Sequence, residues 1–147
     1  MYQVTRTVCR PRAWRSADAL LRKPFDPHIP IYVQILAAFQ RALARGDLTP
    51  GERAPAVRDL ATTLVVNPNT ILRAYQQLEA EGFLFTRRGL GTFVTADAEV
   101  LSRLRTRLAD AAATTYLEEM EALGFSREVA VERLADVPRP VPREGDE

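Results

Sequence analysis

The fold of this chain is decided by the stretch NPNTILRAYQQL, residues 67–78. Asn67 is a good helix N-cap, and Pro68 suits the first helical position because its missing N–H would be unpaired there anyway. The apolar side chains recur at the spacing of one helical face, namely Ile71, Tyr75 and Leu78. The stretch therefore predicts a helix that runs from Pro68 to about Glu81.

The other side of this helix is polar and carries Asn69, Thr70, Arg73, Gln76 and Gln77. A helix that enters the major groove of DNA needs such groups, since arginine can read guanine and Asn or Gln can read adenine. Taken alone, Gln76 and Gln77 would be ordinary solvated residues. Asn67 is interpreted first as a cap and second as a DNA contact.

The neighbouring elements complete a pattern. Two helices are predicted before this one, at 31–45 and 55–64, and two short strands after it, at 83–86 and 92–95. The connector RRGLG, residues 87–91, can turn the chain tightly. Helix, helix, tight turn, helix and hairpin in this order predict a winged helix-turn-helix over residues 29–96. The fold class is therefore mainly α with a small β-hairpin.

Two helices are predicted after the hairpin, at 98–123 and 127–137. One stripe of the longer helix is expected to be exposed and to dimerise; it comprises Leu101, Leu104, Leu108, Ala111 and Thr115. The alternative is that this helix folds back on the winged domain of its own chain. Two helices cannot enclose a typical metabolite pocket by themselves, so residues 97–137 are interpreted as a dimerisation segment.

Several motifs resemble the GntR family of regulators, without a gap over about residues 29–95. They are IYVQI (31–35), GDLTPGER (46–53), VRDLA (57–61), NPNT (67–70), RAY (73–75), LEAEG (78–82) and RRGLGTFV (87–94). The step VNPNT, residues 66–70, and the short C-terminal segment are similar to the YtrA subfamily.

The resemblance implies a role for each matched position. Arg58 would contact the DNA backbone or a base, the start of the third helix would engage the major groove, and the wing would meet the minor groove or its phosphates. The glycines of the wing would let backbone N–H groups approach closely. The candidate DNA-binding residues are Arg58, Asn67, Asn69, Thr70, Arg73, Gln77, Arg87, Arg88, Gly89, Gly91 and Thr92.

Two departures from the family pattern limit this transfer. Many GntR proteins have an arginine where Pro68 stands, so the base-reading rules of those relatives are not carried over. The family's Leu-Pro-Ser step before the second helix reads Ala54-Pro55-Ala56 here, and a capping hydroxyl is lost, at a cost of about 1 kcal/mol of helix stability.

Composition narrows the function classes. The 147 residues have a net charge of +1, but residues 1–96 are basic and residues 97–147 acidic, so only the first part is suited to a polyanion. With one cysteine, Cys9, and one histidine, His28, neither an internal disulfide nor a Cys/His zinc site is expected. Catalytic residues, metals and cofactors are not expected, and without an apolar run or signal peptide the chain is expected in the cytoplasm.

The ends are interpreted separately. Residues 1–28 are expected to form a flexible basic arm, with a weak helix around 13–21, and residues 138–147 a disordered tail. The arm either adds phosphate contacts or reflects a start codon assigned too far upstream.

These features predict a repressor that binds pseudo-palindromic operator DNA as a homodimer and responds to an unidentified small-molecule effector. The alternative is a winged-helix adaptor that contacts proteins. The operator, the effector and the regulated genes cannot be derived from the sequence.

Overall fold

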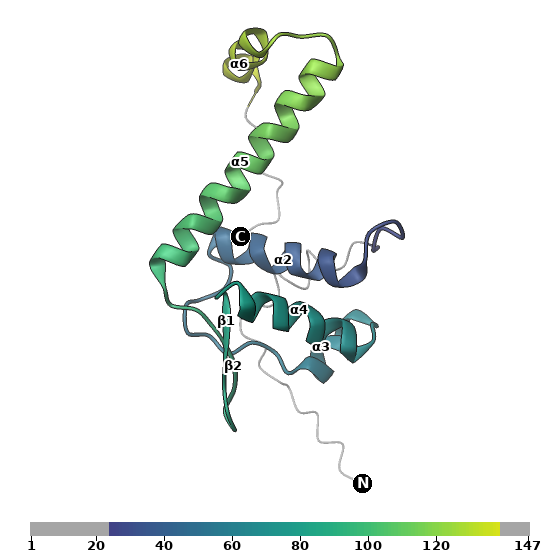
Figure 1. Cartoon of the computed structure of the whole chain (residues 1–147), viewed down its shortest axis with the longest axis vertical. Helices are drawn as coiled ribbons and strands as arrows, with labels where there is room; N and C mark the ends of the chain where they lie inside the picture. Colours follow the sequence, from purple (N-terminus) through teal and green to yellow (C-terminus); the bar gives the residue numbers. More distant parts are fainter. Residues whose placement is uncertain (1–23, 139–147) are drawn as a thin grey trace. The chain divides into compact units, whose positions relative to one another are not determined.

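The computed structural model describes residues 24–138, which divide into two compact units after Thr106. We call residues 24–106 the winged unit and residues 107–138 the helical unit. The elements are α2 (Ile31–Arg45), α3 (Val57–Leu64), α4 (Pro68–Ala80), β1 (Leu84–Arg87), β2 (Gly91–Val94), α5 (Ala98–Ala122) and α6 (Arg127–Asp136) (Figure 1). The predictions made for residues 1–23 and 139–147 lie outside the described residues.

The core of the winged unit lies around α4, which packs against α2, α3 and β1. Ile71 and Leu78 are completely buried, as the helical spacing predicted. The ring of Tyr75 meets that of Phe39 from α2 edge to face, with centroids 5.6 Å apart. The winged helix-turn-helix predicted from the sequence is therefore confirmed.

The second helix starts two residues later than predicted, at Val57, because the backbone of Ala56 is extended. No side chain caps this helix end, in line with the missing hydroxyl. Instead, the carbonyl oxygen of Pro55 accepts a hydrogen bond of 3.0 Å from the hydroxyl of Tyr75. Burial raises the pKa of the Tyr75 hydroxyl well above its usual range, so it remains protonated and able to donate.

The hairpin strands pair antiparallel with the register Leu84↔Val94, Phe85↔Phe93, Thr86↔Thr92 and Arg87↔Gly91. The first strand begins one residue later than predicted, at Leu84, because the backbone of Phe83 bonds back to the last turn of α4. Its N–H donates to the carbonyl of Leu78 at 2.8 Å, after Gly82 has turned the chain with a φ of 81°. Such a left-handed glycine is a common helix stop.

A short segment that the sequence did not predict as a strand lies along the other edge of β2. Arg53 forms an isolated antiparallel bridge with Phe93. The N–H of Ala54 donates to Thr92, and that of Val94 donates to Glu52, both at 2.8 Å. These bonds attach the loop before α3 to the wing.

The first turns of α5 pack into the winged unit, and here one prediction was wrong. Leu104 was expected in an exposed stripe, but only 2% of its surface is exposed. The Nε of Arg105 also donates to the carbonyl oxygen of Ala44 at the end of α2, at 2.8 Å. Leu104 therefore belongs to the core of its own chain, as in the alternative of a helix that folds back.

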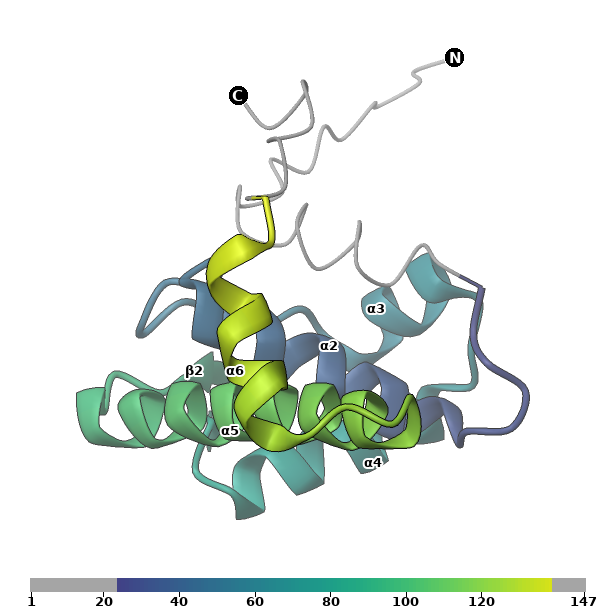
Figure 2. The ribbon, with the colours of Figure 1, turned by 90° about the horizontal axis from the view of Figure 1, so that it is seen from above.

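In the helical unit the chain reverses at Gly124, and α6 lies across α5 rather than along it (Figure 2). The Ser126 side chain caps α6 by accepting from the N–H of Val129. The hydroxyl of Tyr116 donates to the carbonyl of Ala130 at 2.8 Å. Within residues 24–138, no helix has both the length and the apolar character needed to cross a membrane.

The burial of Leu104 predicts that Leu104→Ala destabilises the winged unit by about 2–5 kcal/mol, since a cavity forms where a leucine was packed. Urea denaturation followed by circular dichroism measures this loss. Leu90→Ala is the control, because Leu90 is 59% exposed and its truncation should cost less than about 0.5 kcal/mol. Equal losses in the two variants would show that Leu104 is not packed in the core.

Candidate nucleic-acid interface

The outer side of α4 begins with a capped helix end. The side-chain oxygen of Asn67 accepts the N–H of Asn69 at 2.8 Å, and Pro68 occupies the first turn. The cap predicted for Asn67 is therefore confirmed. Asn67 and Asn69 are exposed and Thr70 is half-buried, so polar groups gather at the end of α4 that a major groove would meet first.

Arg73 is exposed on α4, but its guanidinium is not free in solvent. Its central carbon lies 3.9 Å from the ring centroid of Tyr32 in the first turn of α2. Such a cation–π contact restricts where the guanidinium can point. Sequence reasoning missed Tyr32, because a contact between two helices that lie about forty residues apart has no sequence signature.

Gln77 lies farther along α4 than Arg73. Its side-chain amide donates to Glu81 at 3.0 Å, and Gln40 of α2 donates to the other oxygen of the same carboxylate at 2.9 Å. Gln77 is thus occupied with a carboxylate at the carboxyl end of the helix. Asn69 and Arg73 remain the exposed groups toward the other end.

Arg58 is exposed in the first turn of α3, next to α4. Asp59 is its neighbour in the chain and is exposed as well. In the described part of the chain, neither an ion pair nor a hydrogen bond holds the Arg58 guanidinium. Its charge is therefore available to a ligand.

The two faces of the wing differ. On one face the rings of Phe85 and Phe93 stack with centroids 5.8 Å apart, and the guanidinium of Arg87 lies 5.5 Å and 5.7 Å from the two centroids. On the other face the hydroxyls of Thr86 and Thr92 share a hydrogen bond of 3.0 Å. Thr92 was predicted to contact DNA, and its hydroxyl already has this partner.

The tip of the wing is open. Arg88, Gly89 and Leu90 are all exposed, and the N–H of Leu90 donates to the carbonyl of Arg87 at 3.0 Å. Gly91 follows with a φ of 117°, and an added Cβ there would lie only 2.7 Å from the Nε of Arg53. Sequence reasoning missed Arg53, although it lies within the quoted motif GDLTPGER.

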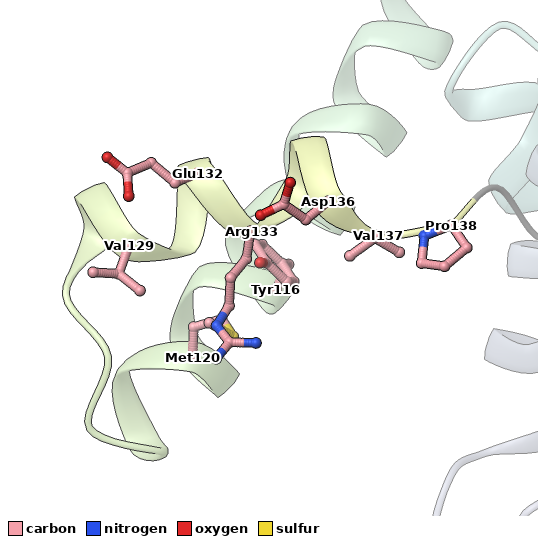
Figure 3. A pocket seen from close by; sticks show the side chains of 8 residues that line it. All are labelled: Tyr116, Met120, Val129, Glu132, Arg133, Asp136, Val137 and Pro138. Carbon is pink, nitrogen blue, oxygen red and sulfur yellow. The ribbon is translucent and has the colours of Figure 1, made fainter.

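The helical unit contains a hollow of about 610 Å³ between α5 and α6 (Figure 3). It is lined by Tyr116, Met120, Val129, Glu132, Arg133, Asp136, Val137 and Pro138. The unit buries little else, since Met120 and Ala130 are its only buried residues between 107 and 138. Large apolar side chains remain exposed at Leu123, Phe125, Val129, Val131, Leu134 and Val137.

Several exposed arginines give the surface around α4 and the wing a positive charge. No three metal-binding side chains come together within residues 24–138. Among the exposed arginines of the winged unit, Arg58, Arg73, Arg87 and Arg88 belong to α3, α4 and the wing, which are the elements that bind DNA in winged helix-turn-helix domains.

The contact between Arg73 and Tyr32 predicts a spectroscopic signature. The side-chain protons of Arg73 should be shifted upfield by the ring, and Tyr32→Leu should remove this shift. NMR of the full chain measures it, with Tyr32→Phe as the control that keeps the ring and the shift. Unchanged Arg73 resonances in Tyr32→Leu would rule out the contact.

Comparison with known proteins agrees with this geometry. Residues 31–94 match the family described as bacterial regulatory proteins, gntR family. The chain is 38% identical to the uncharacterized HTH-type transcriptional regulator YhcF of Bacillus subtilis over 108 residues. This alignment covers 74% of this chain and 89% of YhcF. It is 37% identical to the HTH-type transcriptional repressor YtrA of the same organism, over 64% of this chain and 68% of YtrA.

A solved GntR family transcriptional regulator from Listeria monocytogenes superposes with a TM-score of 0.71 and 34% identity, over 78% of this chain and all of that one. The sequence comparison and the structural comparison thus point to the same family. The chain belongs to the GntR family and is a YtrA-like transcriptional regulator with a helix-turn-helix DNA-binding domain.

Proposed function

We propose that this regulator binds a pseudo-palindromic operator as a homodimer and represses transcription, with α4 as the recognition helix. The observation that carries the proposal is the outer side of α4. There Asn69 and Arg73 are exposed hydrogen-bond donors, and no carboxylate interrupts this side before Glu79. In the major groove such groups distinguish base pairs.

The packing of α4 supports sequence-specific reading. Ile71, Leu78 and Tyr75 hold its inner side, and the Asn67 cap fixes its first turn. Because the helix is held on one side and capped at one end, its outer groups are presented in a defined orientation. Preorganised groups of this kind discriminate better between sites than mobile ones.

Arg58, Arg87 and Arg88 supply the sequence-independent part of binding. All three are exposed on elements beside α4, two of them on the wing. Arginines in such positions contact the DNA backbone and fix the register of the protein on the duplex. Their contribution should weaken as salt rises, because binding releases counterions.

The helical unit supports a homodimer. A unit of this size with two buried residues cannot stabilise itself by its own core, and its exposed apolar side chains need a cover. The predicted stripe, without Leu104, offers Ala111 and Thr115 as exposed residues and Leu108 as a half-buried one. A second copy on this face would give the two-fold symmetry that a pseudo-palindromic operator requires.

Repression and its release are the remaining parts of the proposal. The similar YtrA is described as a repressor, which supports repression here. Two helices do not enclose a pocket, but the open hollow lined by Tyr116 and Arg133 has a volume of about 610 Å³, which is within the usual size of ligand pockets, and this supports release by a small-molecule effector.

Selection of bound duplexes from a random library at physiological salt tests the proposal, with Arg73→Ala beside the wild type. We expect enrichment of a two-fold symmetric motif that is lost or relaxed at one position of each half-site in the variant, since a base contact contributes about 1–3 kcal/mol. No enrichment by the wild type would favour the adaptor that contacts proteins.

Sedimentation and the same selection of duplexes test the dimer with a matched pair of variants. Ala111 and Ala113 are both exposed on α5. Because they are two positions apart along the helix, they lie on nearly opposite sides of it. Ala111→Glu should sediment as a monomer and lose the symmetric motif, whereas Ala113→Glu should keep both. A dimer that persists in Ala111→Glu would place the interface elsewhere.

A further inference from the structure

Two arginines of the wing share one face of the hairpin. Arg53 stands opposite Phe93 in an antiparallel bridge, and Phe93 stands opposite Phe85 in the register of β1 and β2. Residues opposite each other across antiparallel strands point to the same side. Arg87 and Gly91, each two residues further along its strand, lie on this side too.

Gly91 makes room for the first of these arginines. A Cβ built on Gly91 would lie 2.7 Å from the Nε, 3.2 Å from the Nη2 and 3.3 Å from the Cζ of Arg53. A side chain at position 91 would displace the guanidinium of Arg53 from this place, and it would also be strained by the backbone φ of 117°. The absence of a side chain at Gly91 lets the Arg53 guanidinium lie over β2.

The second arginine approaches the same strand from the other side. Arg87 is the register partner of Gly91, and its guanidinium leans back over the stacked rings, 5.7 Å from the centroid of Phe93. Both guanidinium groups thus lie above the segment from Gly91 to Phe93.

Neither arginine is neutralised within the described part of the chain. Arg53 and Arg87 are exposed, and no carboxylate pairs with either of them there. Two like charges over one strand repel each other, and an anion between them removes this cost. Guanidinium groups are planar donors that match the oxygens of a phosphate.

We infer that Arg53 and Arg87 form a single phosphate site, the wing arginine pair, which holds one phosphate of the DNA backbone. The inference rests on the proposed function, since it assumes that the wing lies against a duplex. It assigns a DNA contact to Arg53, and it gives Gly91 a second role beside its backbone φ of 117°, namely to leave room for the Arg53 guanidinium.

The test uses the full chain and the duplex obtained by selection, prepared as a panel in which one phosphate at a time is a neutral methylphosphonate. For the wild type, one position near the wing in each half-site should lower the affinity about tenfold, as expected for a charge-assisted hydrogen bond. In Arg53→Gln and in Arg87→Gln this penalty should shrink at that same position, and in the double variant it should vanish.

Two further variants are controls. Arg53→Lys should restore part of the penalty, because it keeps the charge without the planar donors. Arg41→Gln, on the exposed surface of α2, should leave all positions unchanged. Equal melting temperatures of these variants show that folding is intact.

The test distinguishes a failure of the phosphate site from a failure of the proposed function. If the wild type binds the panel but Arg53→Gln leaves every penalty unchanged, or if Arg53 and Arg87 map to different phosphates, the shared site is wrong and the proposed function stands. If the wild type binds no duplex with a measurable salt dependence, the proposed function is wrong and the phosphate site falls with it.

Discussion

The burial of one side of α4 is the constraint on which the rest of the winged unit depends. Ile71 and Leu78 are completely buried, and Tyr75 is held both by the ring of Phe39 and by its hydrogen bond to Pro55. The helix cannot rotate about its axis without exposing these side chains, at a cost of about 1.5–3 kcal/mol for each. The polar residues on the opposite side are therefore fixed outward, where they can meet a duplex.

The wing depends on the same core through a different set of bonds. Phe83 ends α4 and leads directly into β1, while the segment around Arg53 pairs with the outer edge of β2. A two-stranded hairpin alone is marginally stable in water. The chain connection from α4 into β1 and the pairing along the outer edge of β2 make the wing part of the winged unit, so that its arginines keep a defined position relative to α4.

The sequence predicted the parts of this structure that local patterns determine. The Asn67 cap and the buried spacing of α4 follow from short-range rules, and both are confirmed. Contacts between distant segments could not be predicted, such as Tyr32 with Arg73 or Arg53 over Gly91. The helix at 98–123 was predicted, but periodicity cannot tell whether Leu104 faces its own domain or a second subunit, and the structure buries it in its own domain. Val65 adopts a left-handed φ of 56° in the turn before α4, which is unusual for a β-branched residue and has no signal in the sequence.

Titration of the ¹⁵N-labelled full chain with the selected duplex tests most directly whether α4 and the wing form the DNA-binding surface. We predict that the largest changes in amide chemical shift fall in residues 67–77 and 87–92, with a further change around Arg53. Changes confined to residues 107–138, with the amides of α4 unaffected, would contradict it.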